Sequence, residues 1–125
     1  MTASDIQARL VEGGSRELDC RIEKLVGLAV ALDGAGRATA GDGTRYRVPN
    51  YSTSADAALA LAARVLPGLG AWDVGYAYNA EPPYYARLVL VREGPPEEFG
   101  RANTPAAALC IAVLRAKALQ DGRDG

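Results

Sequence analysis

The pattern of apolar positions predicts two helices that are apolar on every side. Residues 106–114 carry no charged or polar side chain except the thiol of Cys110, and residues 57–63 are only alanine and leucine. Both stretches follow sequences typical of helix starts, Ser52-Thr53-Ser54 and Thr104-Pro105. A helix without a polar face is buried all round, in a layered core or against another subunit. We therefore expect the chain to form a homo-oligomer that covers one of these helices.

Helical and alternating patterns predict the remaining elements. Leu18, Ile22 and Leu25 recur at helical spacing after a capping Ser15, whereas the residues from Trp72 to Asn79 alternate as in a strand. The expected order is α-α-β-β-α-β-β-α, with helices at about 5–12, 16–26, 54–66 and 105–119 and strands at 28–32, 44–48, 72–79 and 84–92.

These elements predict an α+β fold, in which helices flank both faces of one four-stranded, largely antiparallel sheet. The nearly continuous apolar run at 88–91 is typical of a strand covered on both faces. The glycine-rich segment 33–43 is predicted to be the least ordered connection, and a loop containing Phe99 is expected before the last helix. We expect a single domain over 1–125, with an ordered core at about 5–119 and a frayed tail at 120–125.

Composition and charge narrow the classes of function. The net charge of −1 gives no general attraction to nucleic acid, which is therefore not expected as a partner. No apolar run approaches the roughly 20 residues that span a bilayer, and the N-terminus lacks the features of a signal peptide. These observations predict a protein of the cytoplasm without a membrane partner.

The chain has no histidine, which removes the commonest general base and the commonest metal ligand. Its two cysteines, Cys20 and Cys110, fall in predicted helices without a CxxC spacing, so we interpret them as small buried apolar residues with reduced thiols. The carboxylates show no spacing that would place two of them face to face. We expect no metal, no cofactor and no catalytic activity.

Three segments resemble those of a phage protein family, the phage ABA-sandwich domain family. They are 15–19 (SRELD), 51–61 (YSTSADAALAL) and 104–110 (TPAAALC), and the likeness covers most of 5–119. The chain departs from the family in the loop at 33–43 and in lacking a tryptophan in its first hairpin. The resemblance implies a small phage-encoded protein with helices on both faces of a sheet, and brings no established reaction with it. It also implies, by circumstance, a role against host defence, such as sequestering nucleotide-type signals.

Tyrosine and arginine supply the candidate binding chemistry. Six tyrosines against one phenylalanine is a high ratio, and phenol rings offer both stacking area and a hydrogen bond, as a ligand base or ribose would use. Arginine offers a fork for phosphate, and the free N–H groups of the helix that starts near 54 attract anions. The candidate ligand-binding residues are Arg16, Arg47, Tyr51, Ser52, Ser54, Trp72, Tyr76, Tyr78 and Arg87.

Each candidate also has a structural interpretation. The tyrosines can solvate a half-exposed layer of the sheet, the segment Tyr51–Ser54 can serve as a plain N-cap, and Ser15–Glu17 can be a solvated helix start. The function hypothesis is a non-catalytic phage protein that binds and sequesters a small anionic, nucleotide-derived ligand, such as a host antiviral defence signal. The alternative is a phage structural or protein–protein interaction module without a small-molecule ligand.

Overall fold

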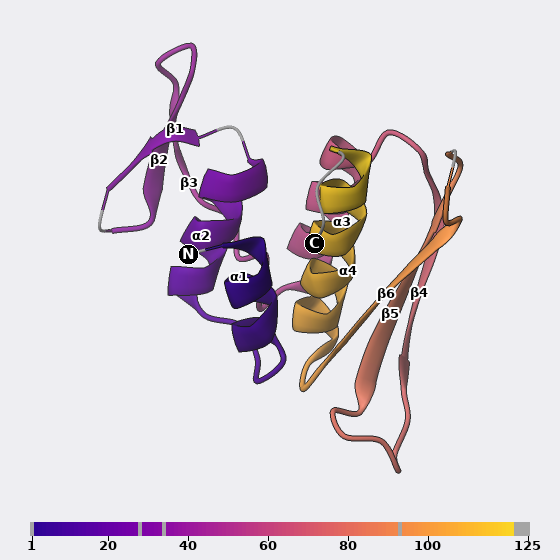
Figure 1. The fold of residues 1–125 in the computed structure, drawn as a ribbon. Coiled ribbons are helices and arrows are strands. Elements are labelled where there is room, and N and C mark those ends of the chain that lie inside the picture. The colour runs from indigo at the N-terminus through magenta and orange to yellow at the C-terminus, as the bar shows by residue number, and fades with distance from the viewer. Residues whose placement is uncertain (1, 28, 34, 93, 122–125) are drawn as a thin grey trace.

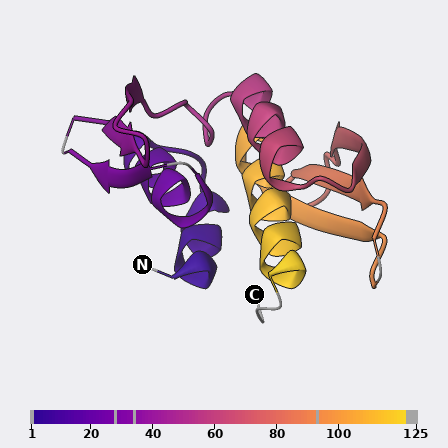
Figure 2. The same cartoon turned by 90° about the horizontal axis from the view of Figure 1, so that it is seen from above.

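In the computed structural model, four helices form a double layer between two separate antiparallel sheets (Figures 1 and 2). The structure describes residues 2–27, 29–33, 35–92 and 94–121, and the statements below concern these residues. The predicted single sheet with helices on both faces is therefore wrong. The class remains α+β, but the helices lie inside and the sheets outside.

Helix α1 (Ala3–Leu10) begins two residues before the predicted start, whereas α2 (Arg16–Val26) begins and ends where the sequence pattern predicted. Thr2 caps α1 in a capping box with Asp5. The hydroxyl of Ser15 accepts a hydrogen bond from the backbone of Leu18, as the sequence predicted for the start of α2.

A strand absent from the prediction builds the small sheet. Strand β1 (Ala29–Leu32) pairs with β2 (Arg37–Ala40), and β2 pairs with β3 (Arg45–Arg47). The side chain of Asp33 accepts hydrogen bonds from the backbone N–H groups of Ala35 and Arg37, which closes a tight turn inside the segment expected to be least ordered. The predicted hairpin of 28–32 with 44–48 is therefore replaced by a three-stranded meander. Leu28 and Gly34 lie outside the described residues.

The large sheet also contains an unpredicted strand. Strands β4 (Leu69–Tyr76), β5 (Tyr84–Leu90) and β6 (Glu97–Ala102) form an antiparallel sheet in that order. The pattern of β6 escaped detection because its buried positions are Glu98, Gly100 and Ala102, none of which is a large apolar residue. Gly100 is required there: a Cβ atom would lie 2.1 Å from the backbone oxygen of Ala108, so β6 and helix α4 pack at backbone distance.

Only one face of the large sheet is covered. Directly opposed residues of antiparallel strands share a face, so Trp72, Leu88 and Glu98 lie toward α4, while Asp73, Arg87 and Phe99 lie on the outer face. No described helix covers that outer face (Figure 1). The expectation that both faces of the run 88–91 are covered is wrong, because Val91 is 80% exposed.

Helix α4 (Pro105–Gln120) forms the centre of the core. All residues from Ala106 to Leu114 are buried, which confirms the prediction of a helix buried all round. Helices α1 and α3 and strands β5 and β6 all pack against α4, so the single chain covers its apolar surface without a partner subunit. A homo-oligomer remains a prediction, but burial of α4 does not require one.

Helix α3 (Ala55–Val65) differs from α4. Ser54 caps it, as the sequence predicted, and Ala58, Leu61 and Ala62 are buried, but Ala60 and Ala63 are exposed. The prediction of burial all round is therefore wrong for α3. A small alanine surface tolerates water at little cost, so the uncharged stretch 57–63 need not be fully covered. Among the described helices, none is long and apolar enough to cross a membrane. Residues 122–125 of the predicted frayed tail lie outside the described residues.

Candidate functional site

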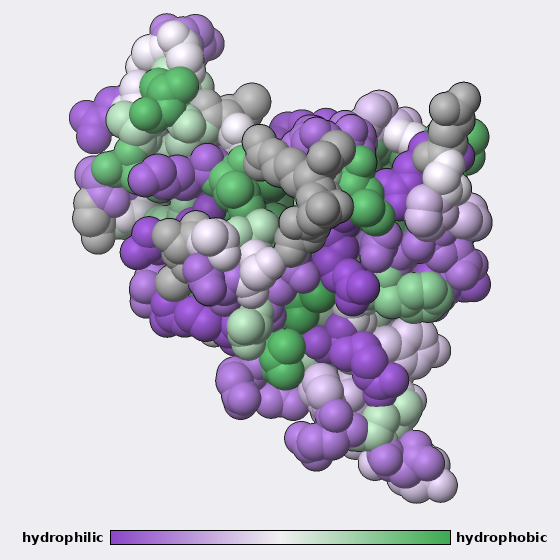
Figure 3. All heavy atoms as spheres, viewed as in Figure 1, coloured by the Kyte–Doolittle hydropathy of each residue, from purple (hydrophilic) through white to green (hydrophobic). Residues whose placement is uncertain are grey.

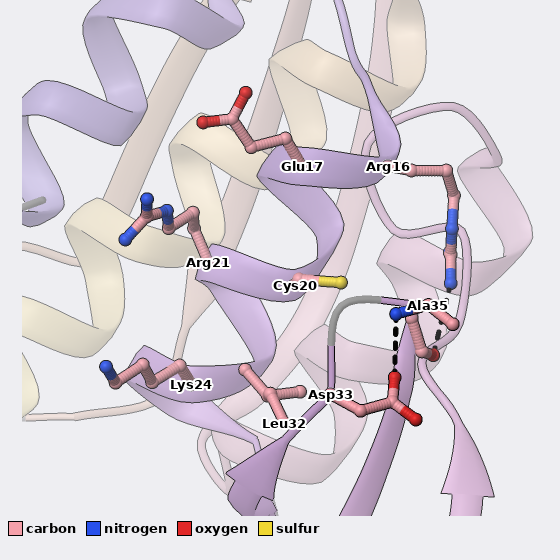
Figure 4. Close-up of a pocket in the computed structure, with 9 residues that line it drawn as sticks. Arg16, Glu17, Cys20, Arg21, Lys24, Leu32, Asp33 and Ala35 are labelled. Carbon is pink, nitrogen blue, oxygen red and sulfur yellow. Dashed lines mark hydrogen bonds between the residues drawn. The ribbon is translucent and has the colours of Figure 1, made fainter.

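A polar cleft of about 580 Å³ lies between α2 and the turn from β1 to β2 (Figure 4). Residues 17, 20, 21 and 24 line it because helical spacing places them on one side of α2. Its other wall comes from the β1–β2 turn. The lining residues are Arg16, Glu17, Cys20, Arg21, Lys24, Leu32, Asp33, Ala35 and Gly36. Figure 4 shows the thiol of Cys20 directed toward Ala35, while Arg21 and Lys24 extend from the helix away from the β1–β2 turn.

Arg16 closes one end of the cleft and is firmly held. Its Nη1 donates to Asp19 Oδ2 at 3.0 Å and to Asn50 Oδ1 at 2.7 Å, and its Nη2 lies 3.5 Å from the carbonyl oxygen of Gly36. Gly36 has φ +82°, and a Cβ atom there would lie 2.7 Å from Arg16 Nη2. Arg16 therefore joins α2 to both neighbouring loops, and its guanidinium is largely occupied by the protein itself.

Both carboxylates of the cleft have partners of their own. Glu17 forms a two-pronged ion pair with Arg9 at 3.1 Å, and the hydrogen bond from Arg9 holds the pKa of Glu17 below its usual value. The backbone N–H groups of Arg37 and Ala35 lower the pKa of Asp33. Both groups are therefore ionised at neutral pH.

The two cations Arg21 and Lys24 are differently placed. Within the described ranges, Arg21 and Lys24 make no hydrogen bond or ion pair. Arg21 is half-buried and Lys24 is exposed. Two cations one helical turn apart that line a polar cleft are suited to hold an anion.

A buried polar network behind the cleft fixes α2 to the segment before α3. The fully buried Asp19 accepts hydrogen bonds from the backbone N–H of Ser52, at 2.8 Å, and from its hydroxyl. The hydroxyl of Ser52 in turn accepts a hydrogen bond from the backbone N–H of Ser15 at 2.9 Å. A buried carboxylate with this many donors is well satisfied, so the network is a structural anchor.

A second buried carboxylate extends the network. The hydroxyl of Tyr51 donates to Glu23 at 2.7 Å, and Arg64 approaches the same carboxylate at 3.9 Å. Burial raises the pKa of Tyr51, and the hydrogen bond to Glu23 raises it further. The thiol of Cys110 donates to the carbonyl oxygen of Tyr51 at 3.1 Å, and burial raises the pKa of that thiol. Both cysteines are free, as predicted, but Cys20 is only half-buried.

The predicted site residues lie in three separate places: before helix α3, on the side of α2 and the small sheet, and with the large sheet. Tyr51 and Ser52 are fully buried in the network, and the hydroxyl of Ser54 caps α3 by accepting from the N–H of Ala57. These three residues have structural contacts, in line with the structural interpretation of the segment Tyr51–Ser54 given above. Arg16 lines the cleft, and Arg47 is exposed on β3, opposite Arg37 of β2.

The remaining predicted residues lie with the large sheet, on the other side of the helices from the α2 cleft (Figure 1). Trp72 and Tyr76 are on β4 and Tyr78 follows it, with 50%, 60% and 86% of their surfaces exposed. Arg87, on β5, pairs with Asp73 and Glu97 at 2.6 and 3.1 Å. No aromatic ring lines the α2 cleft, so the expected pocket of rings and arginines is not assembled there.

Sequence reasoning missed Cys20, Arg21 and Lys24. Their signal was present, because the charged face of the segment 16–26 lies opposite its apolar stripe, but any solvated helix has such a face. The β1–β2 turn makes this face one wall of a cleft, and that strand pairing was not predicted. In the described part of the chain, no group of three or more cysteine or acidic side chains could hold a metal ion.

Fold and site together define a small α+β protein with a helical double layer between two sheets and a cation-lined cleft on one flank. The fold is similar to the crystal structure of a phage protein from Bacillus cereus ATCC 14579, with a TM-score of 0.58 and 18% sequence identity. The match covers 81% of this chain and 89% of that protein. No protein-family model matches the sequence, and no curated protein matches it. The comparison supports a fold shared with a phage protein, and it does not extend to the ABA-sandwich arrangement.

Proposed function

We propose that this protein is a non-catalytic phage protein that binds and sequesters a small anionic, nucleotide-derived ligand in the α2 cleft. The observation that carries the proposal is the pair Arg21 and Lys24, two cations that line a 580 Å³ cleft and make no hydrogen bond or ion pair among the described residues. Ligand sites typically measure about 300–1,000 Å³, so the cleft has the size of a small-molecule site. A host antiviral defence signal is the class of ligand that a phage protein of this kind would remove.

The roles of the cleft residues follow from their contacts. Arg21 and Lys24 pair with a phosphate, while the anchored Arg16 adds positive charge without leaving Asp19. Leu32, whose side chain is half-buried, provides an apolar wall for a ribose or base edge. The lining has no ring for base stacking, so the proposal assigns the affinity to phosphate recognition, and it predicts a strong dependence on salt.

Calorimetry against inorganic phosphate, cyclic nucleotides and ADP-ribose derivatives tests the proposal. We expect at least one nucleotide ligand to bind, and the double variant Arg21→Gln/Lys24→Gln to weaken that binding at least tenfold. The matched control is Arg37→Gln/Arg47→Gln, which removes two exposed cations from the small sheet. Absence of heat and of any thermal shift with every ligand would refute the proposal, as would equal loss in both double variants.

One observation favours the alternative, a protein–protein interaction module. The large sheet presents an uncovered face with Phe99 46% exposed, and Trp72 and Tyr76 stand exposed on its edge strand. Exposed aromatic side chains are enriched in protein interfaces. In that case Trp72→Ala would abolish capture of a partner protein, while the Arg21→Gln/Lys24→Gln variant would capture it as the unmodified protein does.

A further inference from the structure

A second cavity, remote from the α2 cleft, lies where α1, α4 and β6 meet. It measures about 390 Å³, and it is continuous in its lining with a neighbouring hollow of about 300 Å³ through the shared residues Gln7 and Arg115. Val11 and Ile111 form its apolar walls, and Phe99 borders it at the edge strand β6. Figure 3 shows apolar atoms at the surface between α1 and the lower part of α4, in the lower middle of the view.

One donor in this cavity has no acceptor in the described part of the chain. The side-chain nitrogen of Gln7 is buried and has no hydrogen-bond partner there. An unsatisfied buried amide costs about 1–3 kcal/mol, so an acceptor supplied from outside would be favoured. The position of Gln7 in both cavities places this donor at their junction.

Two arginines give the cavity its charge. Arg115 is 51% exposed, and its Nε lies 3.4 Å from the carboxylate of Glu98, which lines the smaller hollow. Arg101 donates one hydrogen bond, to the carbonyl oxygen of Pro82. Apolar walls beside a buried amide donor and two cations match a molecule with an apolar chain and a carboxylate head.

We propose that this cavity binds a medium-chain carboxylate, with its chain against Val11 and Ile111 and its carboxylate accepting from Gln7 and Arg115. The inference does not depend on the proposed function of the α2 cleft, because the two sites share no residue. It assigns to α1 a binding role that the sequence pattern did not indicate.

A homologous series tests the proposal. Binding of butanoate, hexanoate and octanoate is measured by calorimetry below their micelle concentrations, with octanol as the neutral counterpart. Each added methylene buried in the cavity is expected to raise affinity about fourfold. Octanol is expected to bind at least tenfold more weakly than octanoate. No binding of octanoate, or equal binding of octanol, would overturn the proposal.

Variants locate the site. Gln7→Leu replaces the unsatisfied donor by an apolar side chain of similar size, so the fold should be retained and octanoate should bind at least fivefold more weakly. Arg115→Gln should have a similar effect, whereas Gln120→Leu, an exposed change at the end of α4, should have none. Undiminished octanoate binding in both Gln7→Leu and Arg115→Gln would refute the assignment. The Arg21→Gln/Lys24→Gln variant should bind octanoate normally, which separates this site from the α2 cleft.

Discussion

The substitution Asp19→Asn tests whether the buried network anchors α2 to the segment before α3. Asp19 is fully buried and accepts three hydrogen bonds, two from Ser52 and one from Arg16. Asparagine has nearly the same volume, and its oxygen can keep both bonds from Ser52. Its NH₂ group must then face the Arg16 guanidinium. Both groups are hydrogen-bond donors, so the ion pair between residues 16 and 19 is lost.

The expected destabilisation follows from the bond that is lost. A hydrogen bond between charged groups contributes about 1.5–3 kcal/mol, and the 39% exposure of the Arg16 side chain places this pair toward the lower end. We therefore expect Asp19→Asn to lower the free energy of unfolding by about 2 kcal/mol. Asp19→Ala also leaves the N–H of Ser52 buried and unpaired, which raises the expected loss to about 4 kcal/mol.

Urea denaturation followed by circular dichroism provides the assay. The midpoint should fall without a change in the slope, and a loss of 2 kcal/mol should lower the melting temperature by roughly 8 °C. Glu17→Gln is the matched control, because it removes an exposed acidic partner on the same helix and should shift the midpoint little.

A double-mutant cycle isolates the pair. Asp19→Asn combined with Arg16→Gln should be about 1 kcal/mol or more less destabilising than the sum of the single variants. An Asp19→Asn midpoint equal to that of the unmodified protein, or a coupling energy near zero in the cycle, would show that the network does not anchor α2.

Three further predictions rest on other contacts. Tyr51→Phe should destabilise the protein by about 2 kcal/mol in urea denaturation, because it removes the hydroxyl that donates to the buried Glu23; an unchanged midpoint would contradict this role. Gly100→Ala should lower the melting temperature strongly, because the new Cβ would collide with the α4 backbone; a melting temperature within 2 °C of the original would count against so close a packing. With a thiol reagent, half-buried Cys20 should react in the folded protein and Cys110 only after unfolding, since burial raises the pKa of Cys110; a Cys20→Ser variant that keeps the fast reaction would disprove this.

Local chemistry in the sequence predicted the elements that have strong start signals. Ser15, Ser54 and Thr104 each cap the helix that they were expected to cap, and the alternation of residues 84–90 predicted β5. The two missed strands, β2 and β6, lack this kind of signal. Their segments are short, and small or charged residues occupy positions that are buried in the fold.

The predicted binding site failed to assemble for a related reason. Tyrosine and arginine suit both ligand contact and structural roles, and the sequence does not distinguish the two. Tyr51 became a buried donor to Glu23, and Arg87 became the centre of an ion-pair cluster on an open sheet face. The cleft formed instead at Arg21 and Lys24, where an unpredicted turn approaches α2.

The sequence by itself determined the four helices, most of their starts and the full burial of α4, because capping and the absence of any polar face act within one segment. Only the tertiary structure decided that the helices lie between two sheets, and which tyrosines and arginines are buried, paired or free. Strand pairing and side-chain burial depend on contacts between segments far apart in the chain. The residue pattern within one segment does not specify which other segment it contacts.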